Sequence, residues 1–65
     1  MVTKGRYWKM KNVEKMIRNL PMNWMDYLFL IVRMVDGEFW FYGADHDYNR
    51  ALKVADAVEG VVVIL

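Results

Sequence analysis

The dipeptide Asp36-Gly37 lies between two runs of aromatic and branched residues, and it constrains the fold of this chain more than any other feature. Asp-Gly readily adopts the positive φ angles of a two-residue type I′ turn, and the flanking residue types suit a pleated strand. The pattern predicts a β-hairpin made of residues 27–35 and 38–42. In this hairpin Val35 faces Glu38, and the register runs outward until Ile31 faces Tyr42.

The two faces of the predicted hairpin differ in character, because side chains alternate along a strand. One face is wholly apolar and is predicted to be core: Leu28, Leu30, Val32, Met34, Phe39 and Phe41. The other face combines aromatic rings with polar groups: Tyr27, Phe29, Ile31, Arg33, Val35, Glu38, Trp40 and Tyr42.

Tryptophan, tyrosine and arginine are the residue types that most often anchor protein interfaces. We therefore expect five residues of the second face to bind a partner: Tyr27, Phe29, Arg33, Trp40 and Tyr42. Arg33 is expected to lie over Trp40 as a cation–π pair. Three covers for this face stay open, namely the first helix, a second copy of the chain and another protein.

Apolar residues recur at helical spacing in two stretches. The first stretch, with Val13, Met16, Ile17 and Leu20, predicts a helix from Arg6 or Asn12 to Leu20. The second stretch predicts a helix from Tyr48 to Val58, with Asp45 or Asp47 as its cap and Gly60 after its end. The last five residues, Val61–Leu65, predict a third strand.

These elements predict one small α+β domain over residues 1–65, in the order αββαβ. The expected sheet is antiparallel and three-stranded, in the order 2-1-3, with the second helix on its apolar face. Residues 1–11 are expected to form a basic, partly flexible N-terminal segment.

A second copy of the chain is the expected aid to stability. A domain of 65 residues has a small core, and the absence of cysteine excludes disulfides and thiolate zinc sites. Residues 61–65 would also form a bare hydrophobic edge, which tends to associate unless it is covered. We therefore predict a homodimer.

Charge is distributed unequally along the chain. The first twenty residues carry six cations and one anion, whereas the rest carries three cations and seven anions. Lysines and arginines bind phosphates with release of counterions, so a nucleic-acid surface is the alternative function. Its candidate residues are Lys4, Arg6, Trp8, Lys9, Lys11 and Lys15.

Catalysis is not expected. The cluster Asp45-His46-Asp47 holds the only histidine, and helix capping accounts for its two aspartates. The chain has no serine, no cysteine and no glycine-rich phosphate loop. We predict a non-enzymatic protein without a metal or cofactor.

The longest apolar run, residues 27–32, is far shorter than the roughly 20 residues that cross a bilayer. No stretch near the start has the pattern of a secretion signal. A cytoplasmic protein with no membrane contact is expected.

The Asp-Gly hairpin, the helical stretch that begins Tyr48-Asn49-Arg50-Ala51 and the final strand together resemble the outline of two groups of small bacterial and phage proteins. These are HicB-type antitoxin domains and a phage-encoded inhibitor of bacterial RNA polymerase. The resemblance implies a compact domain that acts by occluding a larger protein. The leading hypothesis is therefore a protein-binding module, such as a small regulator or a phage-type inhibitor.

Overall fold

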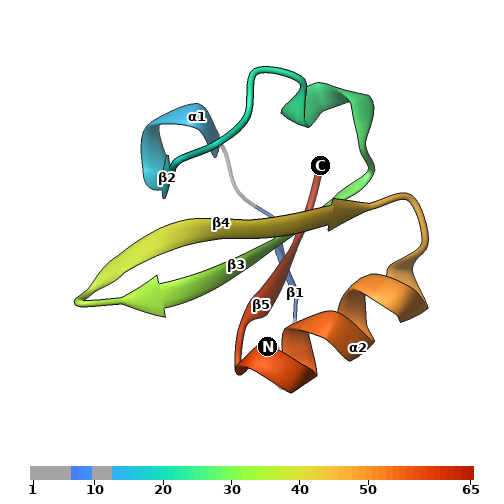
Figure 1. The fold of residues 1–65 in the computed structure, drawn as a ribbon. Coiled ribbons are helices and arrows are strands. Elements are labelled where there is room, and N and C mark those ends of the chain that lie inside the picture. Colours follow the sequence, from blue (N-terminus) through green and yellow to red (C-terminus); the bar gives the residue numbers. More distant parts are fainter. Residues whose placement is uncertain (1–6, 10–12) are drawn as a thin grey trace.

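The β3–β4 hairpin runs through the middle of the structure, which is a computed structural model and describes residues 7–9 and 13–65 (Figure 1). Short elements precede the hairpin, and one helix and one strand follow it. In chain order the elements are β1 (Tyr7–Lys9), α1 (Val13–Met16), β2 (Ile17–Arg18), the 3₁₀ turn η1 (Trp24–Asp26), β3 (Phe29–Val35), β4 (Glu38–Asp45), α2 (Tyr48–Val58) and β5 (Val61–Ile64).

The sheet has the strand order β1-β5-β3-β4-β2. β3 lies between β4 and β5 and is antiparallel to both, as the sequence predicts. Two short strands extend the sheet in parallel orientation, β1 beside β5 and β2 beside β4. The α+β class is confirmed, but the prediction of a three-stranded, all-antiparallel sheet is wrong because these edge strands complete a mixed sheet.

The turn of the hairpin is as predicted. Asp36 has φ 51° and Gly37 has φ 81°, which are the positive angles of a type I′ turn. The register is also confirmed from Val35–Glu38 as far as Val32–Phe41.

A β-bulge interrupts this register between Ile31 and Val32. Ile31 pairs with Gly43, not with Tyr42 as predicted, so Tyr42 is the extra residue of β4. From this point to the end of β4 every side chain changes face. Asp45 consequently lies opposite Phe29.

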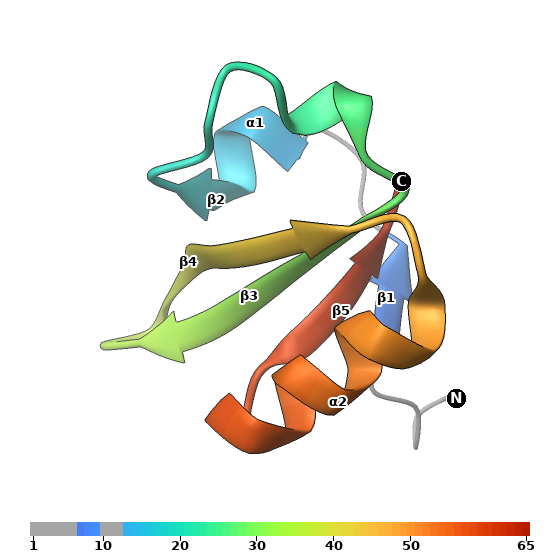
Figure 2. The ribbon, with the colours of Figure 1, turned by 45° about the vertical axis from the view of Figure 1, so that its right-hand side comes forward.

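Helix α2 packs on the face of the sheet that carries Ile31 and Val62 (Figure 2). Ala51 and Ala55 are fully buried at this contact, because their small side chains let the helix approach the strands closely. The prediction that this helix covers the face of Leu30 and Val32 is wrong. The bulge explains the change, since β4 delivers the chain into α2 from the Phe29 side of the sheet.

The wholly apolar face is covered instead by the segment that precedes the hairpin. Val13 and Ile17 are buried there against Leu30, Val32 and Val63. Partly buried side chains complete the cluster: Leu20, Trp24, Phe39, Phe41, Ala44 and Val61. The two faces of the sheet therefore each have a cover made by this chain.

The predicted first helix from Arg6 or Asn12 to Leu20 is mostly wrong. Within the described residues of that range, only Val13–Met16 is helical, and Ile17–Arg18 extends into a strand beside β4. Asn19 then takes a left-handed conformation with φ 61°, which ends the segment and turns the chain. Sheet pairing and burial of Ile17 have replaced the last predicted turn of helix, about four residues. The prediction for residues 1–11 falls mainly outside the described residues, apart from β1.

β5 lies inside the sheet, between β1 and β3. It is therefore not the bare edge on which the prediction of a homodimer partly depends, and the homodimer stays a prediction. None of the helices in the described part of the chain is long and apolar enough to cross a membrane.

Candidate protein-binding surface

The end of the hairpin projects beyond β5 in the sheet. β5 pairs with β3 only as far as Val61–Val32, whereas on the other edge β2 pairs with β4 at Phe39 and Trp40, close to the turn. Figures 1 and 2 both show the β3–β4 turn at the extremity of the fold, away from α2. We call residues 33–42 the arm.

Large apolar side chains are exposed on the arm. The exposed fractions are 55% for Met34, 40% for Val35, 39% for Trp40 and 48% for Tyr42. Val35 and Trp40 lie on the same face of the hairpin as Arg33, whereas Met34 lies on the opposite face with Phe39. Neighbouring exposed apolar groups on one face of a soluble domain commonly mark an interaction site.

One cross-strand row on the arm has an unusual composition. Arg33 of β3 lies opposite Trp40 of β4, and Trp40 is in register with Arg18 of β2. Side chains in register on neighbouring strands share a face, so a tryptophan lies between two arginines across three strands. All three residues are exposed. The row is on the α2 side of the sheet, because the next row, Ile17–Phe39, belongs to the opposite core cluster.

The two arginines have different partners. Arg18 donates to Glu38 Oε2 at 2.7 Å, and both side chains of this pair are exposed. The Arg33 guanidinium lies over the Tyr42 ring, 5.9 Å from its centre. No acidic residue in the described part of the chain pairs with Arg33.

The predicted cation–π partner of Arg33 is wrong, since Tyr42 takes the place assigned to Trp40. The bulge gives the physical reason. Tyr42 has no residue opposite it in β3, and its ring lies beside the guanidinium of the neighbouring strand.

The five predicted partner-binding residues therefore separate into two groups. Arg33, Trp40 and Tyr42 come together on the arm. Tyr27 stacks on His46 with ring centres 5.1 Å apart, and Phe29 packs against Tyr48 at the start of α2 with ring centres 5.5 Å apart. Both are half-buried. Phe29 joins β3 to the start of α2, and Tyr27 joins the chain before β3 to the loop before α2.

The prediction that Leu28 and Met34 belong to the core is wrong, because each is 55% exposed. Met34 lies on the arm, beyond the last residue of β3 that pairs with β5. Val35, which was not among the predicted partner-binding residues, is exposed beside it. A signal was available in strand lengths. The predicted strand 27–35 has nine residues and its predicted neighbour 61–65 has five. One end of the longer strand therefore had to lack a neighbour on the edge where the two strands pair.

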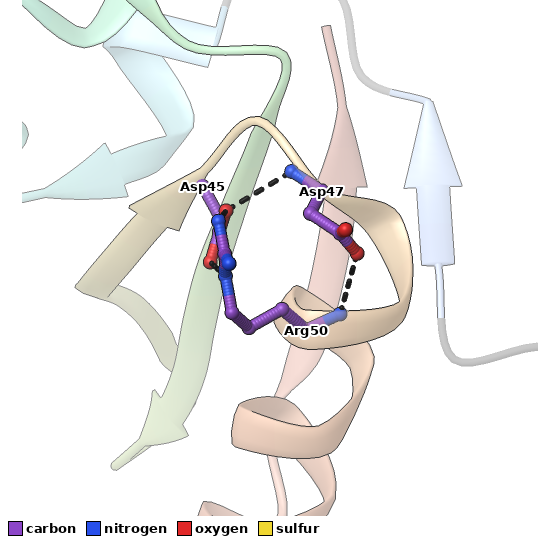
Figure 3. A network of polar contacts seen from close by, with 3 residues as sticks. All are labelled: Asp45, Asp47 and Arg50. Carbon is purple, nitrogen blue, oxygen red and sulfur yellow. Dashed lines mark hydrogen bonds and ion pairs between the residues drawn. The ribbon is translucent and has the colours of Figure 1, made fainter.

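The Asp45-His46-Asp47 cluster holds the start of α2 (Figure 3). Asp47 caps the helix by accepting from the Arg50 backbone N–H at 2.9 Å. Asp45 accepts from the Asp47 N–H at 3.0 Å and from Arg50 Nε and Nη2 at 2.8 and 2.9 Å. The hydrogen bonds from Arg50 hold the pKa of the Asp45 carboxyl well below its usual range. The predicted cap is confirmed for Asp47. Asp45 is not the cap, since it accepts from the Asp47 N–H and from the Arg50 side chain.

No three potential metal-binding side chains converge within residues 13–65. The predicted nucleic-acid residues are not brought together by the part of the chain that the structure describes. Lys4, Arg6 and Lys11 lie outside the described residues, and Trp8 and Lys9 contribute the backbone of β1. Lys15 is exposed on α1.

Comparisons of the chain with protein-family models, with curated proteins and with solved structures each found no match.

Proposed function

We propose that this chain is a small non-enzymatic protein-binding module that docks through the α2-side face of its arm. The observation that supports the proposal is the cluster of Arg33, Trp40 and Tyr42, which is exposed on a projecting hairpin. Tryptophan and tyrosine supply large contact areas with few rotatable bonds to immobilise, and arginine adds directional hydrogen-bond donors. By occupying the surface of a larger protein, such a module would act as a regulator or a phage-type inhibitor.

The rigidity of the arm favours this function. A type I′ turn fixes its tip, and the Arg18–Glu38 ion pair ties β2 to β4 at its side. A partner would therefore meet side chains that are already arranged, which reduces the entropy lost on binding.

The proposal can be tested by affinity capture from the source cell with the wild-type chain and with Trp40→Ala. Loss of a stoichiometric partner is expected for Trp40→Ala, since truncation of a central aromatic anchor commonly costs about 2 kcal/mol or more of binding free energy. Met25→Ala is the matched control, because Met25 is also apolar and is 72% exposed, but lies in η1. Thermal unfolding of each variant would establish that it is folded.

A captured partner that binds Trp40→Ala as well as wild type would contradict the proposal. Recovery of nucleic acid in place of a protein, with binding that is lost between low and moderate salt, would favour the alternative function. Phosphate binding weakens steeply as the salt concentration rises.

A further inference from the structure

The arginine–tryptophan–arginine row on the arm specifies the chemistry of a partner as well as its position. Strands lie about 4.8 Å apart, so the Cα atoms of Arg33 and Arg18 are separated by about 10 Å with the Trp40 ring between them. Each arginine presents a planar fork of N–H donors that matches a carboxylate.

Glu38 shows how a carboxylate binds on this surface. It lies on the arm, and its Oε2 accepts from Arg18 at 2.7 Å. Arg33 occupies the equivalent place on the other side of Trp40, and no carboxylate within residues 13–65 reaches it. Stacking on Tyr42 holds the Arg33 side chain at the surface.

We propose that Arg33 binds a carboxylate of a partner protein while Trp40 and Tyr42 contact an apolar side chain next to that carboxylate. The occupant is thus an acidic segment that carries a large apolar residue. This inference rests on the proposed function and names the chemistry of the partner.

Charge complementarity favours an acidic peptide over nucleic acid. A peptide can place one carboxylate on Arg33 and leave the neighbouring charges undisturbed. A nucleic-acid strand presents a phosphate at every nucleotide, so it would bring several negative charges to the row at once. The acids nearest the row, Asp36 and Glu38, would repel neighbouring phosphates.

Selection from a library of random twelve-residue peptides displayed on phage, with the folded full-length chain as bait, tests the inference. We expect enriched peptides to carry Asp or Glu within a few positions of an aromatic or large aliphatic residue. The enriched peptides should bind Arg33→Gln at least tenfold more weakly, since a carboxylate would lose its charged donor.

Glu38→Gln should have the opposite effect and strengthen the same peptides severalfold, because it releases Arg18 as a second guanidinium beside Trp40. A purely structural role for Arg33 and Glu38 would not produce opposite changes in affinity. Lys53→Gln, which removes an exposed cation from α2, should leave binding unchanged.

Several outcomes would overturn the inference: enriched peptides without acidic residues, binding that is indifferent to Arg33→Gln, no enrichment above background, or displacement of the peptides by single-stranded DNA at moderate salt. A protein captured through Trp40 but not through Arg33 would overturn the inference alone and leave the proposed function standing. Self-association that depends on Arg33 and excludes the peptides would assign the surface to a second copy instead.

Discussion

The two covers of the sheet are built in different ways. On one face, α2 is an eleven-residue helix with a side-chain cap at Asp47 and backbone hydrogen bonds that close its end at Glu59 and Gly60. On the other face, the segment from α1 to η1 has only one helical turn, a two-residue strand and a 3₁₀ turn. Yet Val13 and Ile17 of this segment are almost as deeply buried as the alanines of α2.

The difference shows that burial can be specified by local or by distant interactions. α2 carries its own start, stop and apolar stripe within a dozen residues. The α1–η1 segment is held by contacts with strands that follow it in the chain, so its conformation depends on the completed sheet. We expect the α1–η1 segment to lose its structure when one buried side chain such as Ile17 is truncated. In α2, each substitution should change the free energy of unfolding only by its own local contribution.

The largest effect is expected for Ile17→Ala. Ile17 is 5% exposed, and removing its branched side chain opens a cavity against Leu30 and Val32, at a cost of about 3 kcal/mol in the free energy of unfolding. Urea denaturation measures the loss, and hydrogen exchange should show lower protection in residues 13–26 before α2 is affected.

Met16→Ala is the control for this prediction. Met16 is adjacent but half exposed, so its truncation should change stability by no more than about 0.5 kcal/mol. Equal losses for the two variants would contradict the idea that single anchors hold the segment.

Gly60→Ala should also be strongly destabilising. Its effect falls on the other cover of the sheet, at the junction of α2 and β5. A Cβ at this position would overlap the Val32 carbonyl oxygen and meet Val58 Cγ2 at 3.3 Å, so the junction of α2 and β5 would have to move. Overpacking of this kind costs about 2 kcal/mol, which chemical denaturation would detect. Gly43→Ala is the matched control, because its Cβ would meet only Ile31 Cδ1, at an ordinary 3.8 Å. If Gly43→Ala were destabilising and Gly60→Ala neutral, the close backbone contact would not be at Gly60, and the prediction would be wrong.

Glu59→Gly is expected to stabilise the protein. Glu59 adopts a left-handed conformation with φ 56° at the end of α2, where glycine has no steric penalty. The expected gain is about 0.5–1 kcal/mol, read from the melting temperature. Lys53→Gly, in the interior of the same helix, should instead lose about 1 kcal/mol. A loss at both positions would show that Glu59 has a role beyond its backbone conformation.

The smallest effect concerns pH, because Asp45 and Arg50 form a pair near the surface, with the Arg50 side chain 68% exposed. The folded-state pKa of Asp45 is lowered, so the pair contributes stability above the ordinary aspartate pKa of about 3.9 and loses it as pH falls toward the folded value. Unfolding measured between pH 7 and pH 2.5 should therefore be less pH-dependent in Asp45→Asn. Arg50→Gln should flatten the curve in the same way, and an unchanged curve in either variant would refute the coupling.

The sequence predicted the elements whose signals are local. The Asp36-Gly37 turn, the register next to it and the span of α2 all depend on residues within a few positions of one another. The same is true of the aspartate cap. On the arm, the shared face of Arg33 and Trp40 followed from the alternation of a regular hairpin, whereas their role in binding a partner stays a prediction.

The remaining features depend on distant contacts. Ile17 and Leu20 have helical spacing, but β4 offers Ile17 a strand partner that no local pattern reveals. β1 and β2 contain three and two residues, too few for periodicity to indicate a strand. The bulge had one sign, Gly43 inside a strand, because glycine often marks such an irregularity.

The bulge in β4 decides which side chains of that strand face α2. If β4 paired regularly through Tyr42, Asp45 would lie opposite Leu28 on the face away from α2, and Arg50 would lose its carboxylate. Deletion of Tyr42 would have a different result, because Phe41 and Gly43 already oppose the adjacent residues Val32 and Ile31. The shortened strand would be regular, and Gly43–Asp45 would keep their partners in β3. The strand can therefore lose this one residue without any change in the side chains that it presents to the helix.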